Sequence, residues 1–191
     1  MPNFPLVAGP TATIAVERAG FSSPNLADAI MTSIVELITG PSVQLDLDVA
    51  DRAALFSAVA TCWPNQPALT PTSAAQFLMA RESLGSTGLG KGVAIPHARC
   101  KGLTAPLGAF IRTRKAIEFD APDGLPVDCF VFMLVPDNAA QAHLDLLAQV
   151  ATALSREHVR ETLRSAKTAD EVTNALKPAP ASPIRPTHGG H

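Results

Sequence analysis

One short stretch, residues 81–97, contains most of the side chains in this chain that could do chemistry. It reads RESLGSTGLGKGVAIPH, with an arginine at its start, several glycines in its middle and a histidine at its end. A neutral imidazole is a nucleophile near pH 7 and can carry a covalent intermediate. The backbone N–H groups of a glycine-rich loop can hold an anion, and Pro96 stiffens the backbone next to His97. The pattern therefore predicts that His97 reacts with an anionic group, such as a phosphoryl group in transit.

Two other side chains are candidates to act with His97. Arg81 lies near the end of a predicted helix. It either binds phosphate oxygens at two points, or is a solvated surface arginine, or pairs with Glu82. His143 lies at the start of the helix that follows a predicted central strand. It reaches His97 only if that strand lies beside the short strand before His97, and otherwise it is an exposed histidine of a first helical turn. The loop residues expected to cradle the phosphoryl group are Ser86, Thr87, Gly88, Gly90 and Gly92.

Other chemistries fit the sequence less well. The glycines at 88–92 are not a dinucleotide-binding fingerprint, because they precede a strand instead of opening a helix, and no Walker A loop is present. A zinc site built from His97, Cys100, Cys129 and His143 lacks paired ligand spacing. A hydrolase with His97 as its base lacks a partner nucleophile in a recognisable motif. The glycine-rich segment that precedes His97 argues against a purely structural role for this histidine.

The elements that must position these residues alternate between strand and helix patterns. Strands are predicted at 43–47, 93–95, 107–112, 116–119 and 127–135, and the last is apolar enough to be central and buried on both faces. Helices are expected over 24–39, after caps at Asp48, Thr70 and Thr168, and over two segments that carry Leu144–Leu154 and Val159–Leu163. This interleaving predicts a single α/β domain over residues 24–177.

Composition and charge exclude several classes of protein. Hydrophobic residues make up 47% of the 191, which is typical of a globular domain, whereas 1–23 read as an irregular extension and 178–191 as a Pro-rich disordered tail. A net charge of −2 without a run of Lys or Arg argues against nucleic-acid binding. The longest apolar run, 129–135, is too short to cross a membrane. The three cysteines show no C-x-x-C spacing, as expected of reduced thiols, and the N-terminus lacks the early basic residue of a secretory signal. Both features favour a cytoplasmic location.

The stretch RESLGSTGLGKGVAIPHAR resembles the active-site signature of the enzyme IIA domain of the fructose/mannitol type, from the bacterial phosphoenolpyruvate-dependent phosphotransferase system. Within that family, the sequence resembles the nitrogen-regulatory branch more than the other branches. VQLDLDVADRAALFSAVA is similar to the first strand and helix of the family, and QAHLDLLAQVATAL to its late helix with a second active-site histidine. The resemblance covers residues 34–176, which is almost the whole predicted domain.

The resemblance implies a fold, a partner and a role for each candidate residue. The fold would be a mixed β-sheet flanked by helices, with no metal or organic cofactor. His97 would accept a phosphoryl group from a phosphohistidine on a small carrier protein of the HPr or NPr kind. Arg81 would hold the phosphoryl oxygens, and His143 would be the second histidine, close to the first. The sequence does not say which ring nitrogen of His97 reacts, and we take the tele nitrogen as the candidate.

Three functions follow as hypotheses. The first is a phosphocarrier that accepts a phosphoryl group on His97 and regulates partners according to its phosphorylation state. The second is an IIA-like binding module that regulates a partner without being phosphorylated, although Arg81, His97 and His143 are all present. The third is the sugar-specific IIA component of a fructose/mannitol-type uptake system, which is disfavoured because no permease or IIB-like segment is present.

Overall fold

The computed structural model describes residues 33–64, 66 and 69–178. Its mixed sheet contains strands β1 (Val43–Leu47), β2 (Gly88–Gly90), β3 (Val93–Ala94), β4 (His97–Cys100), β5 (Leu107–Ile117) and β6 (Val127–Pro136). The strand order is β1-β5-β6-β3-β2, and β4 also pairs with β6. The pairs β5–β6 and β2–β3 are antiparallel, and the other pairs are parallel. The predicted single α/β domain with a mixed sheet flanked by helices is confirmed.

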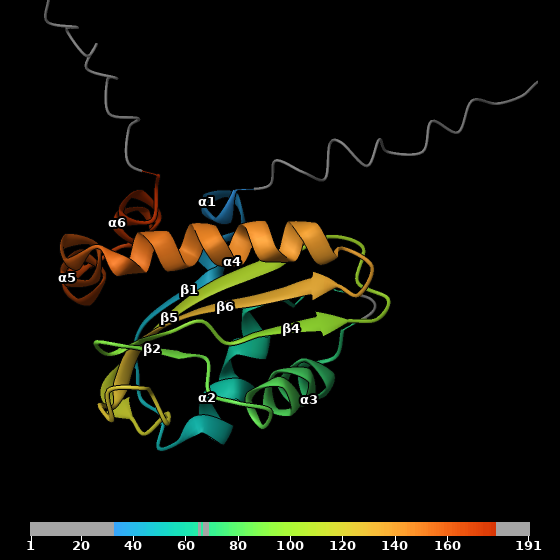
Figure 1. Ribbon diagram of the computed structural model, residues 1–191, viewed down its shortest axis with the longest axis horizontal. Helices are drawn as coiled ribbons and strands as arrows, with labels where there is room; N and C mark the ends of the chain where they lie inside the picture. The colour runs from blue at the N-terminus through green and yellow to red at the C-terminus, as the bar shows by residue number, and fades with distance from the viewer. Residues whose placement is uncertain (1–32, 65, 67–68, 179–191) are drawn as a thin grey trace, which may run out of the picture.

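Helices cover both faces of this sheet (Figure 1). One face carries α1 (Ile34–Leu37), α4 (Ala140–Ser155), α5 (Glu157–Ser165) and α6 (Ala169–Ala175), whereas the other carries α2 (Arg52–Val59) and α3 (Pro71–Glu82). Two short 3-10 helices, Gly40–Ser42 and Ala60–Cys62, precede β1 and follow α2. Alternate residues of β6 enter the two cores: Phe130, Phe132 and Leu134 pack toward α2 and α3, and Val131, Met133 and Val135 toward α4. The apolar run of β6 therefore places it in the centre of the sheet.

The segment from β3 to β4 is the part of the fold that matters most for the candidate site. Ala94 of β3 pairs with Phe130 of β6, and His97 of β4 pairs with Met133. Two residues separate Ala94 from His97, and two also separate their partners on β6. Strand β4 therefore continues in line with β3 beside the same neighbouring strand, after a break at 95–96. His97 thus begins a strand, whereas the sequence pattern placed it at the end of one. Strand β4 itself was not predicted.

Other boundaries also differ from the sequence-based predictions. The helix expected over 24–39 does not continue through Ser33, because Ser33 is extended and caps α1; the part before it lies outside the described residues. Asp51 caps α2 in place of Asp48, since its side chain accepts the backbone N–H of Ala54 at 2.8 Å. The strands predicted at 107–112 and 116–119 form one strand, β5, whose register against β6 shifts after Arg112.

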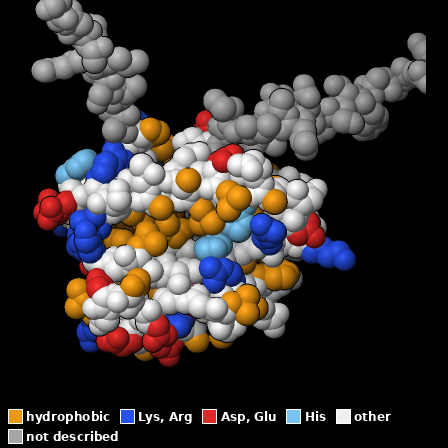
Figure 2. Space-filling model, viewed as in Figure 1, with side chains coloured by type: hydrophobic (Ala, Val, Ile, Leu, Met, Phe, Trp, Pro, Cys, Tyr) orange, Lys and Arg blue, Asp and Glu red, His pale blue; other side chains and the backbone are white. Residues whose placement is uncertain are grey.

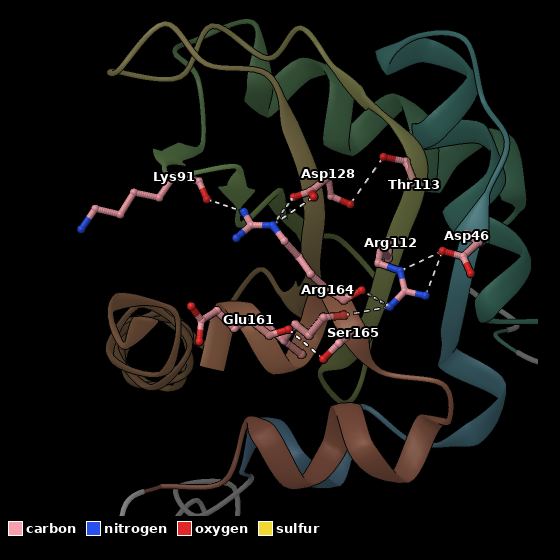
Figure 3. Close-up of polar contacts among 9 residues, drawn as sticks. Asp46, Lys91, Arg112, Thr113, Asp128, Glu161, Arg164 and Ser165 are labelled. Atoms are coloured by element: carbon pink, nitrogen blue, oxygen red, sulfur yellow. Dashed lines mark hydrogen bonds and ion pairs between the residues drawn. The ribbon is translucent and has the colours of Figure 1, made fainter. Parts of the chain in front are cut away.

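A buried arginine joins the end of α5 to the sheet (Figure 3). The Arg112 side chain leaves β5 and donates from Nη1 to the carbonyls of Leu163, Arg164 and Ala166 at 2.8–3.0 Å. Its Nε and Nη2 reach Asp46 at 2.9 and 2.8 Å. These carbonyls lie at the end of α5 and would otherwise lack hydrogen-bond partners. Arg112 supplies the donors, and Asp46 neutralises the charge of its guanidinium.

Replacing this arginine is expected to destabilise the fold strongly. In Arg112→Met the apolar volume is kept but the buried carbonyls lose their donor, which costs about 3–5 kcal/mol in the free energy of unfolding. Urea unfolding followed by circular dichroism measures the difference. Arg114→Met is the matched control, because Arg114 makes only an exposed 3.6 Å ion pair with Asp48, worth less than about 1 kcal/mol. Equal effects of the two substitutions would contradict the role given to Arg112.

Candidate active site

The break between β3 and β4 sets the orientation of the His97 ring. Its Nδ1 lies 2.7 Å from the carbonyl oxygen of Ile95, two residues earlier. A carbonyl oxygen only accepts hydrogen bonds, so Nδ1 carries the ring proton. The neutral ring therefore keeps its lone pair on Nε2, the tele nitrogen. The ring is partly exposed, so the free nitrogen is accessible at the surface of the protein.

Arg81 approaches this lone pair from the last turn of α3, a helix that packs against β4. Its Nε donates to His97 Nε2 at 3.2 Å, and its Nη1 donates to the Gly85 carbonyl at 3.0 Å. Nη2 makes no hydrogen bond to any residue of the described part of the chain. The guanidinium thus lies beside the free nitrogen of His97 and keeps unused N–H donors. An anion bound at that nitrogen could accept hydrogen bonds from them.

His143 completes the cluster from the first turn of α4. Its ring lies edge-on to that of His97, with 5.2 Å between ring centroids and 71° between ring planes. Arg99 of β4 donates from Nε to His143 Nδ1 at 3.3 Å. His143 is only 6% exposed, and its Nε2 has no hydrogen-bond partner among residues 33–64, 66 and 69–178. The strand adjacency on which this placement depended is present, because β6 lies beside both β3 and β4.

The glycine-rich loop is used largely for structure. Buried Glu82 accepts from the backbone N–H and hydroxyl of Thr87 at 2.9 and 2.6 Å, and the Ser86 hydroxyl donates to Phe119 O and accepts from Gly88 N. No hydrogen bond joins Ser86, Thr87, Gly88, Gly90 or Gly92 to His97, Arg81 or His143 in the described structure. The phosphoryl contacts expected of this loop therefore stay a prediction.

The two later glycines turn the β2–β3 hairpin. The backbone angle φ is +55° at Lys91 and +74° at Gly92, so both turn residues are left-handed, as in a tight hairpin turn of the primed type. A Cβ on Gly90 would lie 2.9 Å from the Asp123 carboxylate, and a Cβ on Gly92 would meet Arg164. Hairpin closure therefore favours glycine at both positions, and so does close packing, which is against the loop after β5 at Gly90 and against α5 at Gly92.

Electrostatics keep both histidines neutral. Burial is the main cause that lowers the pKa of His97 below 6.5; Arg81 adds to this effect, whereas the Ile95 carbonyl and Glu82 oppose it. The pKa of His143 falls to about 4, first through burial and then through His97, Arg99 and Arg81. At pH 7 the site therefore presents a free nitrogen on His97 next to cationic guanidinium groups. This is a combination that attracts an electrophilic anion.

The histidines lie in a hollow beside α4 that combines charge and apolar surface. Figure 2 shows histidine side chains in this hollow with Lys or Arg side chains next to them and hydrophobic side chains along its wall. Leu84, which follows α3, is 84% exposed, and Leu144, which follows His143, is 57% exposed. Large apolar side chains exposed beside a reactive group are typical of a surface that docks another protein.

Two residues of this site have contacts that the sequence did not indicate, although Arg99 was expected to add positive charge after His97. Glu82 was considered only as a partner of Arg81, but it ties down the loop through Thr87. Arg99 contacts His143 from β4. A strand starting at His97 would have indicated Arg99, because residues two apart on a strand share a face. That signal was hidden, since four residues reading HARC have little strand character.

The zinc hypothesis finds no support in the geometry. Cys100 pairs with Pro136 of β6, whereas Cys129 lies seven residues earlier on the same strand, which is a separation of about 23 Å. No group of three or more His, Cys, Asp or Glu side chains in the described part of the chain could hold a metal ion. Within the same residues, no helix combines the length and the apolar character needed to cross a bilayer.

Comparison with known proteins identifies relatives of the whole domain. The crystal structure of the nitrogen regulatory protein IIA-Ntr from Neisseria meningitidis superposes on this protein with a TM-score of 0.72. The two sequences are 41% identical, and the match covers 75% of this chain and 99% of that one. The nitrogen regulatory protein of Pseudomonas aeruginosa is 50% identical over 93 residues, 49% of this chain. That match spans only 60% of the relative's own length.

Two further matches extend over more of the domain. The nitrogen regulatory protein homolog of Haemophilus influenzae is 32% identical over 143 residues, which are 73% of this chain and 87% of that protein. The profile of the family described as "Phosphoenolpyruvate-dependent sugar phosphotransferase system, EIIA 2" matches residues 36–178 and so includes Arg81, His97 and His143. The chain therefore belongs to the type 2 EIIA family of the phosphoenolpyruvate-dependent sugar phosphotransferase system.

Proposed function

We propose that this protein is a phosphocarrier that accepts a phosphoryl group on Nε2 of His97. The observation that supports this most directly is the pair of hydrogen bonds on the ring: Nδ1 donates to Ile95 O, and Nε2 accepts from Arg81. One nitrogen is thereby left as the nucleophile, with a guanidinium next to it for the oxygens of the incoming group. The donor we propose is a phosphohistidine on a carrier protein of the HPr or NPr kind.

The transfer needs little from the protein except positioning. The Nε2 lone pair forms the new N–P bond while the N–P bond of the donor histidine breaks and returns its electron pair to the donor ring. His97 becomes cationic on transfer, and the Ile95 carbonyl stabilises that charge because it accepts from Nδ1. Arg81 exchanges its contact with Nε2 for contacts with phosphoryl oxygens, while its bond to Gly85 O keeps it in place.

We propose further that the phosphorylation state regulates protein partners, as in the nitrogen-regulatory branch. The relatives in Pseudomonas and Haemophilus carry the names nitrogen regulatory protein and its homolog, which favours regulation over sugar uptake. A phosphoryl group brings a charge of about −1.5 to −2 at pH 7 to a surface that is cationic without it. Leu84 and Leu144 are exposed and lie three residues after Arg81 and one after His143, so they are candidates to contact a partner that senses this charge.

Phosphoryl acceptance is the direct test of this function. The protein is mixed with phosphoenolpyruvate, the first enzyme of the system and its histidine carrier, and intact mass is measured. One acid-labile phosphoryl group is expected on the wild type and on His158→Ala, whose histidine is exposed on α5, and none on His97→Ala. Nitrogen NMR of the product should place phosphorus on Nε2. A folded protein that accepts nothing from the carrier would favour the binding-module hypothesis.

Arg81 should determine the rate of transfer without being modified itself. We expect Arg81→Ala to slow phosphoryl acceptance on the order of 100-fold, because it removes charged donors from the phosphoryl oxygens. Arg81→Lys should recover only part of the rate, since an ammonium cannot donate in a planar pair. Single-turnover transfer from the phosphorylated carrier gives the rates. Arg114→Ala, far along β5 and exposed, serves as the control and should leave the rate unchanged.

The lowered pKa values predict how the histidines titrate and how stability depends on pH. By NMR, His143 should titrate near pH 4 and His97 below 6.5. Both pKa values return toward 6.5 on unfolding, so the unfolded state binds more protons as the pH falls below 6.5, and stability decreases there. Urea unfolding over this pH range should show that loss, and His143→Asn should reduce it. An ordinary titration of His143 would refute the burial argument.

A further inference from the structure

We propose that Arg99 is a positioning residue, which holds the ring proton of His143 on Nε2 and so presents a neutral N–H donor to the phosphoryl group on His97. This inference rests on the proposed function, because it assigns His143 a contact with the transferred group. The observation behind it is a single hydrogen bond, from Arg99 Nε to His143 Nδ1, together with an unpartnered nitrogen on the other side of the same ring.

The tautomer follows from the donor. A guanidinium has only donors, so His143 Nδ1 must accept and must carry the lone pair. The single proton of the neutral ring is then on Nε2. That nitrogen is buried and finds no acceptor within residues 33–64, 66 and 69–178, although a buried N–H without a partner costs about 1–3 kcal/mol. Such a donor is free to bond an acceptor that enters the site.

We infer that the acceptor is a phosphoryl oxygen on His97, because the two rings are neighbours. The His143 ring lies edge-on at 5.2 Å from the His97 ring, and Arg81 marks the Nε2 side of His97 as the reactive one. Phosphoryl oxygens carried on that nitrogen would be acceptors next to His143. With the opposite tautomer, His143 would present a lone pair to those oxygens and repel them. The choice between the two tautomers therefore decides whether His143 supports or opposes the phosphorylated state.

Strand β4 makes this control possible. His97 and Arg99 are two residues apart on β4 and share one face of the strand, and they pair with Met133 and Val135 of β6. Arg99 is an exposed residue, and its Nε is the atom that donates to His143. The same short strand thus supplies both the nucleophile and the residue that sets the proton of its neighbour.

The test exchanges the donor for an acceptor. In Arg99→Glu a carboxylate faces His143 Nδ1, which should move the proton to Nδ1 or make the ring cationic, whereas Arg99→Lys keeps a donor. The readout is the ring nitrogen spectrum of His143 in the unphosphorylated protein near neutral pH, which separates the two tautomers without any transfer reaction. We expect the Nε2–H signature in the wild type and in Arg99→Lys and its loss in Arg99→Glu. An unchanged signature in Arg99→Glu would overturn the proposal.

Transfer rates then test the consequence for function. Arg99→Glu should slow phosphoryl acceptance on the order of 10- to 100-fold, as expected when one donor to the transferred group is lost. Lys101→Glu makes the same change of charge two residues away, at an exposed turn position without a contact to His143, and should stay within about twofold of the wild type. Equal slowing by both variants would show that only surface charge matters, and would also overturn the proposal.

A double-mutant comparison separates action through His143 from direct contact with the carrier. In a His143→Ala background, Arg99→Glu should have no additional effect on the transfer rate. If it slows transfer there by the same factor, Arg99 acts on the partner and the proposal is wrong. If the wild type accepts no phosphoryl group at all, the proposed function fails, while the nitrogen spectra still decide whether Arg99 sets the tautomer.

Discussion

The hydrogen bond from His97 Nδ1 to the Ile95 carbonyl is the contact on which the site depends. It holds the ring proton on one nitrogen and leaves the other free, and it determines the direction in which the free nitrogen points. The bond spans the break between β3 and β4, and both strands are held in register by β6. The backbone N–H of Met133 also donates to the Pro96 carbonyl at 3.0 Å, within the break itself. The orientation of the nucleophile is thus set by sheet pairing and not by side-chain packing alone.

The resting site is electrostatically incomplete. Arg81 and Arg99 each donate to a neutral imidazole, which is a weaker partner for a guanidinium than a carboxylate or a phosphate. The nearest buried carboxylate, Glu82, is occupied by Thr87. By contrast, Arg112 and Arg164, which serve the fold, are paired with Asp46 and Asp128. The contrast with these two arginines agrees with the proposed function, in which the full partner of Arg81 would be the transferred phosphoryl group.

Sequence patterns predicted the core of this arrangement because that core rests on strong local signals. The continuous apolar run at 127–135 placed β6 in the centre, and its adjacency to Val93–Ala94 brought His143 toward His97. The patterns failed where pairing partners override weak propensity, as for β4, whose polar residues are strand only because β6 extends beside them. They also could not indicate why the glycines are present: hairpin geometry requires Gly90 and Gly92, while anion binding by the same loop stays a prediction.

Under the proposed function, the position of the site beside β4 would let another protein detect phosphorylation of His97. The C-terminal end of α3 and the first turn of α4 meet there and carry Arg81 and His143, while Leu84 and Leu144 extend outward from the same two helices' ends. Under the proposed function, apolar contacts of the leucines with a partner would not depend on phosphorylation, whereas contacts of the arginines would. Under the proposed function, affinity for a partner would come mainly from the former and discrimination between the two states from the latter, because charge complementarity governs specificity more than binding strength. No rearrangement of the sheet is needed for such a switch.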